Sequence, residues 1–344
     1  MRASGAVRRA ATTAALLLLA LLAPGLPGGP ARAAPEAPRW GRDYFPNVPL
    51  VTQDGKVVHF YDDLIQGKVV AINFIFTSCS ETCPAETARL RQVYKLLGDR
   101  VGRDVFLYSI SIDPEHDTPE VLKAYREKFR IGPGWTFLTG KQEDVTLLRR
   151  KLGLRTDDVT DGNRDHATSL VVGNEATGQW IKRSPFDNPR ILAGLLGERL
   201  HNWKTGPGGA AQASYAEATL IEKFSRGEYL FRTRCSSCHT LGASAAADPV
   251  GPDLLGVVDK RSPEWLARWL KAPDAMIAER DPVALELLAQ YRDLRMPNLS
   301  LNDVDVASLI EFMESESLRA VEAREREAAA GAATADPHAH HHHR

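Results

Sequence analysis

The four cysteines of the chain form two close pairs, Cys79/Cys83 and Cys235/Cys238, and this arrangement limits what the chain can be more than any other feature. Four cysteines are too few for a disulfide scaffold in a chain of 344 residues, so we expect each pair to carry chemistry of its own. The length is about twice the roughly 150 residues typical of one domain, which predicts two folded units and some trailing sequence.

The composition is that of an ordinary globular protein, with 43% hydrophobic and 25% charged residues. The 43 Lys and Arg residues balance 44 Asp and Glu residues, for a formal net charge of -1. Proteins that bind nucleic acid usually carry a strongly basic surface, so this balance argues against such a partner. Small molecules, metals and other proteins are the partners we expect.

The N-terminus has the layout of a signal peptide, with Arg8 and Arg9 ahead of an apolar run at 10–23 and small residues beyond it. We predict a signal peptide over residues 1–33, cleaved near Ala33. Retention as an anchor is the alternative, although the run is shorter than the about 20 apolar residues that a spanning helix needs. The protein is then exported, to the periplasm or the extracytoplasmic face of the cytoplasmic membrane, and only an uncleaved N-terminus would tie it to the membrane.

Strand and helix patterns alternate over residues 40–204. Residues 68–76 and 104–112 are almost continuously apolar, as strands covered on both faces of a sheet are. Apolar residues at helical spacing lie between them. The alternation predicts an α/β domain with a central sheet. Its further elements are a hairpin at Asp54-Gly55, strands at 135–138 and 168–172, and helices that begin near Pro119, Glu143 and Pro189.

The strand signal disappears after this domain. Residues 205–214 are small and rich in glycine, which predicts a flexible linker. Residues 317–344 are rich in Ala, Glu and Arg and then in His, without the apolar stripe that would hold them to a core, so we expect a disordered tail. Between them lies a predicted small all-α domain, residues 215–316, with helical patterns at 215–231, 263–271, 282–292 and 303–316.

Residues 235–239 read Cys-Ser-Ser-Cys-His, the CxxCH motif of c-type haem attachment. Two thiols three residues apart on a helical turn can each form a thioether to one edge of a porphyrin, and the next residue presents an imidazole nitrogen to the iron. Export and helical surroundings favour this interpretation over a chance match or a redox dithiol. We therefore assign Cys235 and Cys238 to the thioethers and His239 to the iron.

A methionine is expected as the sixth iron ligand. Met296 precedes Pro297 in a segment without helical pattern, so its thioether can project toward the haem. Met313 lies in the amphipathic final helix and is predicted to be core, and Met276, in an apparently polar loop, is a weaker alternative. Ligation by His and Met leaves no open iron position, which predicts electron transfer rather than oxygen binding.

Residues 215–316 resemble the class I cytochromes c. In that family the carbonyl of a loop proline accepts a hydrogen bond from the haem histidine, and the resemblance implies this role for Pro252. The residues that carry the resemblance are Gly227 and Phe231 ahead of the CxxCH motif, Val250-Gly251-Pro252-Asp253-Leu254 after it, Met296-Pro297 and the final helix.

Cys79 and Cys83 follow directly on the buried strand at 68–76 and open the next helix. The free N–H groups and dipole of a helix N-terminus favour thiolates, so both sulfurs should be easy to deprotonate. Residues four apart on a helix have Cβ atoms about 5–6 Å apart, whereas a disulfide needs about 3.5–4.5 Å. A metal ion between two thiolates fits this spacing better, although some backbone adjustment would permit a disulfide.

Soft thiolates suit Cu(I), and imidazole suits copper in either oxidation state, so we expect a histidine as third ligand. His166 immediately precedes the predicted strand at 168–172, where an adjacent-strand loop meets the cysteine helix in a thioredoxin-like sheet. The other histidines of this domain are His59 in the early hairpin, His116 in a charged loop and His201 near a helix end.

Residues 44–203 resemble the Sco/SenC family, thioredoxin-like copper proteins that help assemble the copper A centre of cytochrome c oxidase. The resemblance implies that Cys79, Cys83 and His166 are copper ligands and that Asp165 orients the histidine. Ser80, where many members have proline, and Ala167, where a hydroxyl residue is common, depart from the family without removing a ligand. The shared motifs are Phe76-Thr77-Ser78-Cys79 with Cys83-Pro84, Ser111-Ile112-Asp113-Pro114-Glu115 with Asp117-Thr118-Pro119-Glu120-Val121-Leu122, and Asp165-His166.

Two further features carry weaker signals. Asp113 and Asp117 invite a reading as paired catalytic acids, but we interpret them as turn and helix-capping residues. The histidines at 340–343 could bind metal, or form an expression tag or a solvated tail.

The two resemblances predict an exported copper metallochaperone with a fused c-type haem for one-electron transfer. Its expected partner is the copper A subunit of cytochrome c oxidase or another redox protein. The alternative is a thiol:disulfide oxidoreductase in which Cys79 and Cys83 are catalytic and exchange electrons with the haem; a peroxidase of the peroxiredoxin kind has no independent support.

Dithiol couples lie near about −120 to −270 mV, below the potential expected of a His/Met haem. Electrons would therefore run from the dithiol to the haem, and a one-electron haem matches Cu(I)/Cu(II) better than a two-electron disulfide.

Overall fold

The computed structural model describes residues 40–79, 82–154, 169–200, 224–242 and 249–334. The predicted signal peptide, the linker at 205–214, His166 with Asp165, and the histidines at 340–343 lie outside the described residues. Among the described helices, none is both long enough and apolar enough to cross a membrane.

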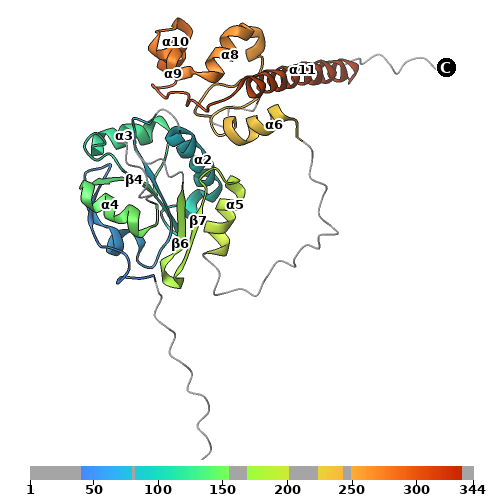
Figure 1. The fold of residues 1–344 in the computed structure, drawn as a ribbon. Coiled ribbons are helices and arrows are strands. Elements are labelled where there is room, and N and C mark those ends of the chain that lie inside the picture. Colours follow the sequence, from blue (N-terminus) through green and yellow to red (C-terminus); the bar gives the residue numbers. More distant parts are fainter. Residues whose placement is uncertain (1–39, 80–81, 155–168, 201–223, 243–248, 335–344) are drawn as a thin grey trace, which may run out of the picture. The chain divides into compact units, whose positions relative to one another are not determined.

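Within the described residues, the first domain is built on one seven-stranded sheet with the strand order β2-β1-β5-β4-β3-β6-β7 (Figure 1). The central strands β3, β4 and β5 are parallel, and the strands outside them pair antiparallel. The bounds are Pro49–Thr52 for β1, Val57–His59 for β2, Val69–Ile75 for β3, Val105–Ser111 for β4, Trp135–Gly140 for β5, Leu170–Asn174 for β6 and Gln179–Arg183 for β7.

The register of β3 and β4 brings the ends of these two strands together. Val69 lies opposite Val105 and Ile75 lies opposite Ser111, so the loops that follow the two strands leave the sheet at the same edge. The side chains of β3 are buried on both faces apart from partly buried Phe74, which agrees with its continuous apolar run.

Helices cover both faces of this sheet. Helix α2 packs against α5, and α4 lies on the opposite side (Figure 1). Thr118 caps α3 through its side chain, and Pro119 occupies the first turn, as the sequence predicts. The bounds are Thr82–Leu97 for α2, Pro119–Lys128 for α3, Gln142–Lys151 for α4 and Pro189–Gly194 for α5, which continues as η4 (Leu195–Arg199); the short helices are η1 (Phe60–Ile65), η2 (Gly98–Arg100) and η3 (Glu175–Thr177).

The predicted thioredoxin-like α/β fold is confirmed, and strand β7 is an addition to it. The predicted strands at 68–76, 104–112 and 135–138 correspond to β3, β4 and β5. Strand β7 was not predicted. It pairs with β6 through a turn at Gly178, whose φ of +68° lies in the left-handed region that favours glycine.

The second domain is entirely helical in its described part, apart from an isolated bridge between Thr240 and Asp253. Its first and last helices, α6 and α11, cross closely. A Cβ atom added to Gly227 would lie 2.0 Å from the backbone oxygen of Ser308, so the crossing requires glycine at this position. The bounds are Arg226–Leu230 for α6, Phe231–Cys235 for η6, Val257–Lys260 for α7, Pro263–Lys271 for α8, Pro273–Ala278 for α9, Pro282–Gln290 for α10 and Asp303–Thr334 for α11.

Helix α11 corrects the prediction of a disordered tail for residues 317–334, and residues 335–344 lie outside the described part of the chain. The helix runs for 32 residues and ends at Thr334. Ala, Glu and Arg are among the best helix formers, and Arg319 pairs with Glu316 one turn away. The missing apolar stripe removes packing partners, as exposed Leu318 and Val321 show, but it does not prevent helix formation.

Candidate metal and haem centres

Cys83 lies in the first turn of helix α2, which begins at Thr82, whereas Cys79 lies in the loop between β3 and this helix and does not open it as predicted. The backbone N–H of Cys79 donates to the carbonyl of Phe76 at 3.2 Å. The backbone N–H of Cys83 in turn donates to Sγ of Cys79 at 3.5 Å. Both side chains are buried, with 7% and 5% of their surfaces exposed. The sulfur of Cys79 therefore accepts a hydrogen bond from the first turn of the helix.

The metal-free pair holds a proton tightly, which corrects the expectation that both sulfurs deprotonate easily. A hydrogen bond with Cys79, followed by burial, raises the pKa of the Cys83 thiol well above its ordinary value. Two neighbouring sulfurs cannot both become anionic in a buried site without a compensating cation. A metal ion that binds both sulfurs must therefore displace this proton.

Glu86 is a buried carboxyl group beside the thiol pair. Only 3% of its surface is exposed. Burial, and then the negative charge of Cys79, raise the pKa of Glu86 to about 8. The carboxyl group is thus mostly protonated at neutral pH, which avoids a further negative charge near the sulfurs. Its position three residues after Cys83, on the same face of the helix, is the sequence signal that could have identified it.

Asp117 ties the cysteine loop to the end of the neighbouring strand. Its carboxylate accepts hydrogen bonds from the backbone N–H of Thr77 at 3.1 Å, the Thr77 hydroxyl at 2.5 Å and the Ser111 hydroxyl at 2.5 Å. The side chain is buried, with 1% exposed. The helix cap is Thr118, which accepts from the N–H of Val121 at 3.4 Å, so the helix-capping interpretation of Asp117 is wrong.

The structure does not place the predicted third copper ligand, because His166 lies outside the described residues. Within the described ranges, which omit 155–168, no group of three or more His, Cys, Asp or Glu side chains gathers. His59 lies beside Asp63, and Nδ1 of His116 lies 2.8 Å from the carboxylate of Asp113. His201 also falls outside the described part of the chain.

The CxxCH motif folds as a compact turn in the second domain. Cys235 ends η6, and its carbonyl accepts from the N–H groups of Cys238 and His239, both at 3.0 Å. Nδ1 of His239 donates to the carbonyl of Pro252 at 2.9 Å, which confirms the predicted role of this proline. The bond leaves Nε2 as the nitrogen that can bind a metal. Burial lowers the pKa of His239, which favours the neutral, coordinating imidazole.

Burial also affects the first thiol of the motif. It raises the pKa of Cys235 to about 12, so this sulfur stays an uncharged thiol until it is covalently modified.

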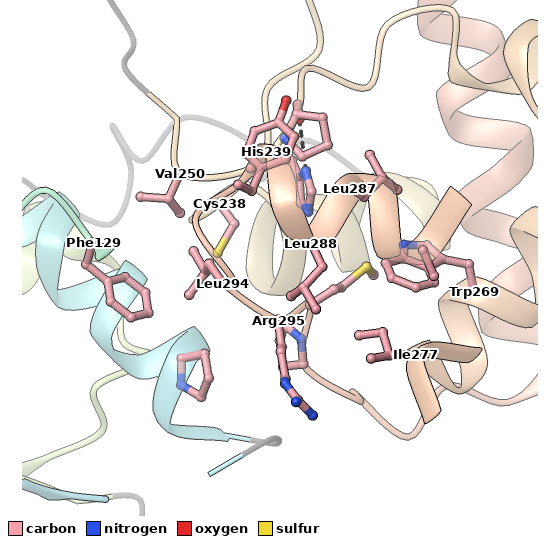
Figure 2. A pocket seen from close by; sticks show the side chains of 17 residues that line it. Phe129, Cys238, His239, Val250, Trp269, Ile277, Leu287, Leu288, Leu294 and Arg295 are labelled. Atoms are coloured by element: carbon pink, nitrogen blue, oxygen red, sulfur yellow. Dashed lines mark hydrogen bonds between the residues drawn. The ribbon is translucent and has the colours of Figure 1, made fainter. Parts of the chain in front are cut away.

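A cavity of about 1050 Å³, including its open mouth, adjoins this motif. Cys235, His239 and Met296 line it, and an adjoining pocket shares His239 and Met296 and adds Cys238. Figure 2 shows Cys238 and His239 together with apolar residues of the helical domain, among them Trp269, Leu287 and Leu288. The cavity and the adjoining pocket together bring both thiols and one imidazole to an apolar space, which fits a haem.

The three methionines of the domain differ in their surroundings. Met296 lies in the cavity lining between α10 and α11, where the sequence places the iron ligand. Met313 belongs to the hydrophobic core, as predicted, and also borders the cavity. Met276 is not in a polar loop but in α9, where only 1% of it is exposed. Met276 is not among the residues that line these two cavities.

Comparison with known proteins identifies both domains. The SCO1/SenC family matches residues 40–191, and the cytochrome c family matches residues 224–317. The SCO1 protein homolog of Bacillus subtilis is 38% identical over 145 residues, which is 40% of this chain and 74% of that protein. A protein of Stutzerimonas stutzeri whose name describes it as copper-binding is 30% identical over 146 residues, which is 41% of this chain and 70% of that protein.

A solved structure, the cytochrome c domain of the pp3183 protein from Pseudomonas putida, is 52% identical; it covers 27% of this chain and 89% of that domain, with a TM-score of 0.25. With a thioredoxin-like sheet that carries a buried cysteine pair, and a helical domain that carries a CxxCH turn, the chain belongs to the SCO1/SenC family and bears a cytochrome c domain at its C-terminal side.

Proposed function

We propose that the protein is an exported copper metallochaperone for the copper A centre of cytochrome c oxidase, with a c-type haem that transfers single electrons. The observation that carries the proposal is the buried Cys79/Cys83 pair at the first turn of α2, where one sulfur already accepts a backbone N–H. The SCO1/SenC membership of the domain and the copper-binding name of its Stutzerimonas stutzeri relative support copper as the ion.

Cys79, Cys83 and His166 would hold the copper ion. Two thiolates and an imidazole form a donor set that suits Cu(I) and also accepts Cu(II). Loading requires the pair to release the proton that the metal-free site retains. Burial of both sulfurs slows exchange with small thiols, so that transfer favours a protein partner that can reach the site.

Cys235 and Cys238 would attach the haem, and His239 and Met296 would bind its iron. The haem supplies one-electron transfer. The hydrogen bond from His239 to Pro252 fixes the orientation of the imidazole, and the apolar residues of the cavity would exclude water from a bound haem. Since a His/Met haem lies at higher potential than a dithiol, this domain would accept electrons from the first domain.

Anaerobic titration of the purified haem-bearing protein with Cu(I), followed in the haem and copper spectra together, tests the proposal. One tightly bound copper ion per chain is expected, and His166→Ala should weaken it. Full Cu(I) and Cu(II) affinity in His166→Ala, together with disulfide reductase activity, would instead favour a thiol:disulfide oxidoreductase that uses Cys79 and Cys83. The hydrogen bond from the backbone N–H of Cys83 to Sγ of Cys79 brings the two residues together and is the observation that favours this second function.

A further inference from the structure

The loop that carries Cys79 begins where the sheet ends. The last ladder bond between β3 and β4 runs from the N–H of Ile112 to the carbonyl of Ile75 at 2.9 Å. Cys79 lies four residues beyond Ile75, and its neighbour Ser78 is exposed. The position of the first sulfur therefore depends on the contacts that hold the segment from Ile75 to Cys79, and Thr77 lies in the middle of it.

Asp117 supplies that attachment from another segment of the chain. Its carboxylate accepts two hydrogen bonds from Thr77, two residues before Cys79, and a third from Ser111 at the end of β4. The turn that carries Asp117 is itself fixed, because its N–H donates to the carbonyl of Asp113 at 2.9 Å and the N–H of Asp113 donates to the Ser111 hydroxyl at 3.0 Å.

A buried carboxylate is costly unless donors satisfy it, and these three donors come from the two strand ends that meet at the site. We infer that Asp117 is a positioning residue for the metal centre: through Thr77 it fixes the backbone that aims Cys79 Sγ at the first turn of α2. This inference rests on the proposed copper function for its metal readout. The placement of the sulfur itself is a property of the metal-free chain.

Thr77 provides a matched pair of variants. Thr77→Val keeps the backbone bond to Asp117 and removes the hydroxyl bond, whereas Thr77→Ser keeps both. Asp117→Asn retains the size of the side chain but turns one acceptor into a donor that faces other donors. The control is Asp62→Asn, which loses surface contacts with Arg42 and Asn47 in the same domain, away from the cysteine loop.

Two measurements on the haem-bearing, full-length variants test the inference. The first is the alkylation rate of Cys79 and Cys83 in reduced, metal-free protein, with the labelled peptides assigned by mass spectrometry. The second is Cu(I) affinity by competition with a chromophoric chelator. Residues that hold metal ligands in place typically change metal affinity by about 10- to 100-fold when mutated.

We expect Asp117→Asn to lower Cu(I) affinity at least about 10-fold and to raise the Cys79 alkylation rate by a similar factor. Thr77→Val should show part of both effects, and Thr77→Ser and Asp62→Asn should stay within about twofold of the unmodified protein. If Asp117→Asn fails to fold, the difference between Thr77→Val and Thr77→Ser in Cu(I) affinity and Cys79 alkylation rate tests the inference instead.

Unchanged alkylation and unchanged affinity in Asp117→Asn or, if that variant does not fold, in Thr77→Val, would overturn the inference while leaving the copper function intact. If the unmodified protein binds no copper, the proposed function fails, and the alkylation rates still decide whether Asp117 positions the sulfur.

Discussion

The two cysteine pairs have similar spacing in the sequence, yet they differ in how much of their site is local. The CxxCH turn contains both sulfurs and the imidazole within five residues, and the imidazole donates its supporting hydrogen bond to the carbonyl of Pro252 on a nearby loop. The first pair has one sulfur in the loop before α2 and one in its first turn, its loop support on Asp117, and its proposed third ligand four residues before β6 in the sequence. Most residues of such a haem site come from one short segment of the sequence. The residues of a copper site on a thioredoxin-like sheet come from separate segments that the fold brings together.

Removal of a sulfur from the first pair should have the largest effect. Cys83→Ala deletes one proposed copper ligand, and we expect Cu(I) affinity to fall by at least about 100-fold, beyond what loss of a supporting residue causes. The haem spectrum should not change. Competition titration measures the Cu(I) affinity, and the visible spectrum of the same sample reports on the haem. A changed haem spectrum would show that the two centres are not independent.

The corresponding change in the second domain is Met296→Ala. Loss of a thioether ligand should abolish the low-spin, six-coordinate spectrum and lower the haem potential by on the order of 100 mV, because axial ligands tune haem over about 0.8 V. Spectroelectrochemistry measures both quantities. Met313→Leu is the matched control, since it keeps core volume and should retain the low-spin spectrum; an unaltered spectrum in Met296→Ala would refute the ligand assignment.

Gly227→Ala tests whether the two domains are independent, because it disturbs the packing of α6 against α11 in the haem domain alone. The added methyl group meets the Ser308 carbonyl oxygen at 2.0 Å, so α6 and α11 must separate. Overpacking of this kind costs about 1–3 kcal/mol. Thermal unfolding followed at the haem band should shift to lower temperature, while Cu(I) affinity stays the same. Gly194→Ala, where the added methyl group meets no atom within 4 Å, is the control.

The last prediction concerns Glu86→Gln, which should change the pH dependence of stability rather than either metal site. The folded pKa of Glu86, about 8, lies above its unfolded value near 4.5, so the folded protein holds a proton that the unfolded chain has lost. Stability therefore falls as pH rises from about 4.5 to 8, by up to about 1.4 kcal/mol per pH unit.

Glutamine does not titrate, so Glu86→Gln removes this pH dependence. The variant should gain stability at pH 8 relative to the unmodified protein and gain none below pH 4.5. Denaturant unfolding at several pH values measures the free energy of unfolding of both proteins, with exposed Glu143→Gln as control. Parallel pH curves for the unmodified protein and Glu86→Gln would mean that Glu86 is not held as a buried acid.

The sequence predicts the parts of the molecule whose signals are local. The apolar run of β3, the proline start of α3 and the CxxCH turn all appear where their patterns indicate. Asp117 could not be recognised as a partner of Thr77, because the parallel register of β3 and β4 creates that contact across forty residues of sequence.

The misassigned tail shows the converse error. The absence of an apolar stripe correctly predicts that residues 318–329 lack a packed face, as exposed Leu318 and Val321 confirm. It does not predict disorder, because helix propensity and neighbouring charges act along the chain without a core. The prediction for the Cys83 thiol failed for a comparable reason. Its position at the start of a helix favours the thiolate, but the hydrogen bond with Cys79 and burial raise its pKa, and neither can be read from the local sequence.

The long final helix has a practical consequence. A helix rises about 1.5 Å per residue, so the part of α11 beyond residue 316 extends roughly 27 Å. Residues 317–334 thus form a rigid spacer between the haem cavity and anything joined after Thr334. A fluorophore or an electrode linker attached there should report on the cytochrome from a defined distance without altering its spectrum.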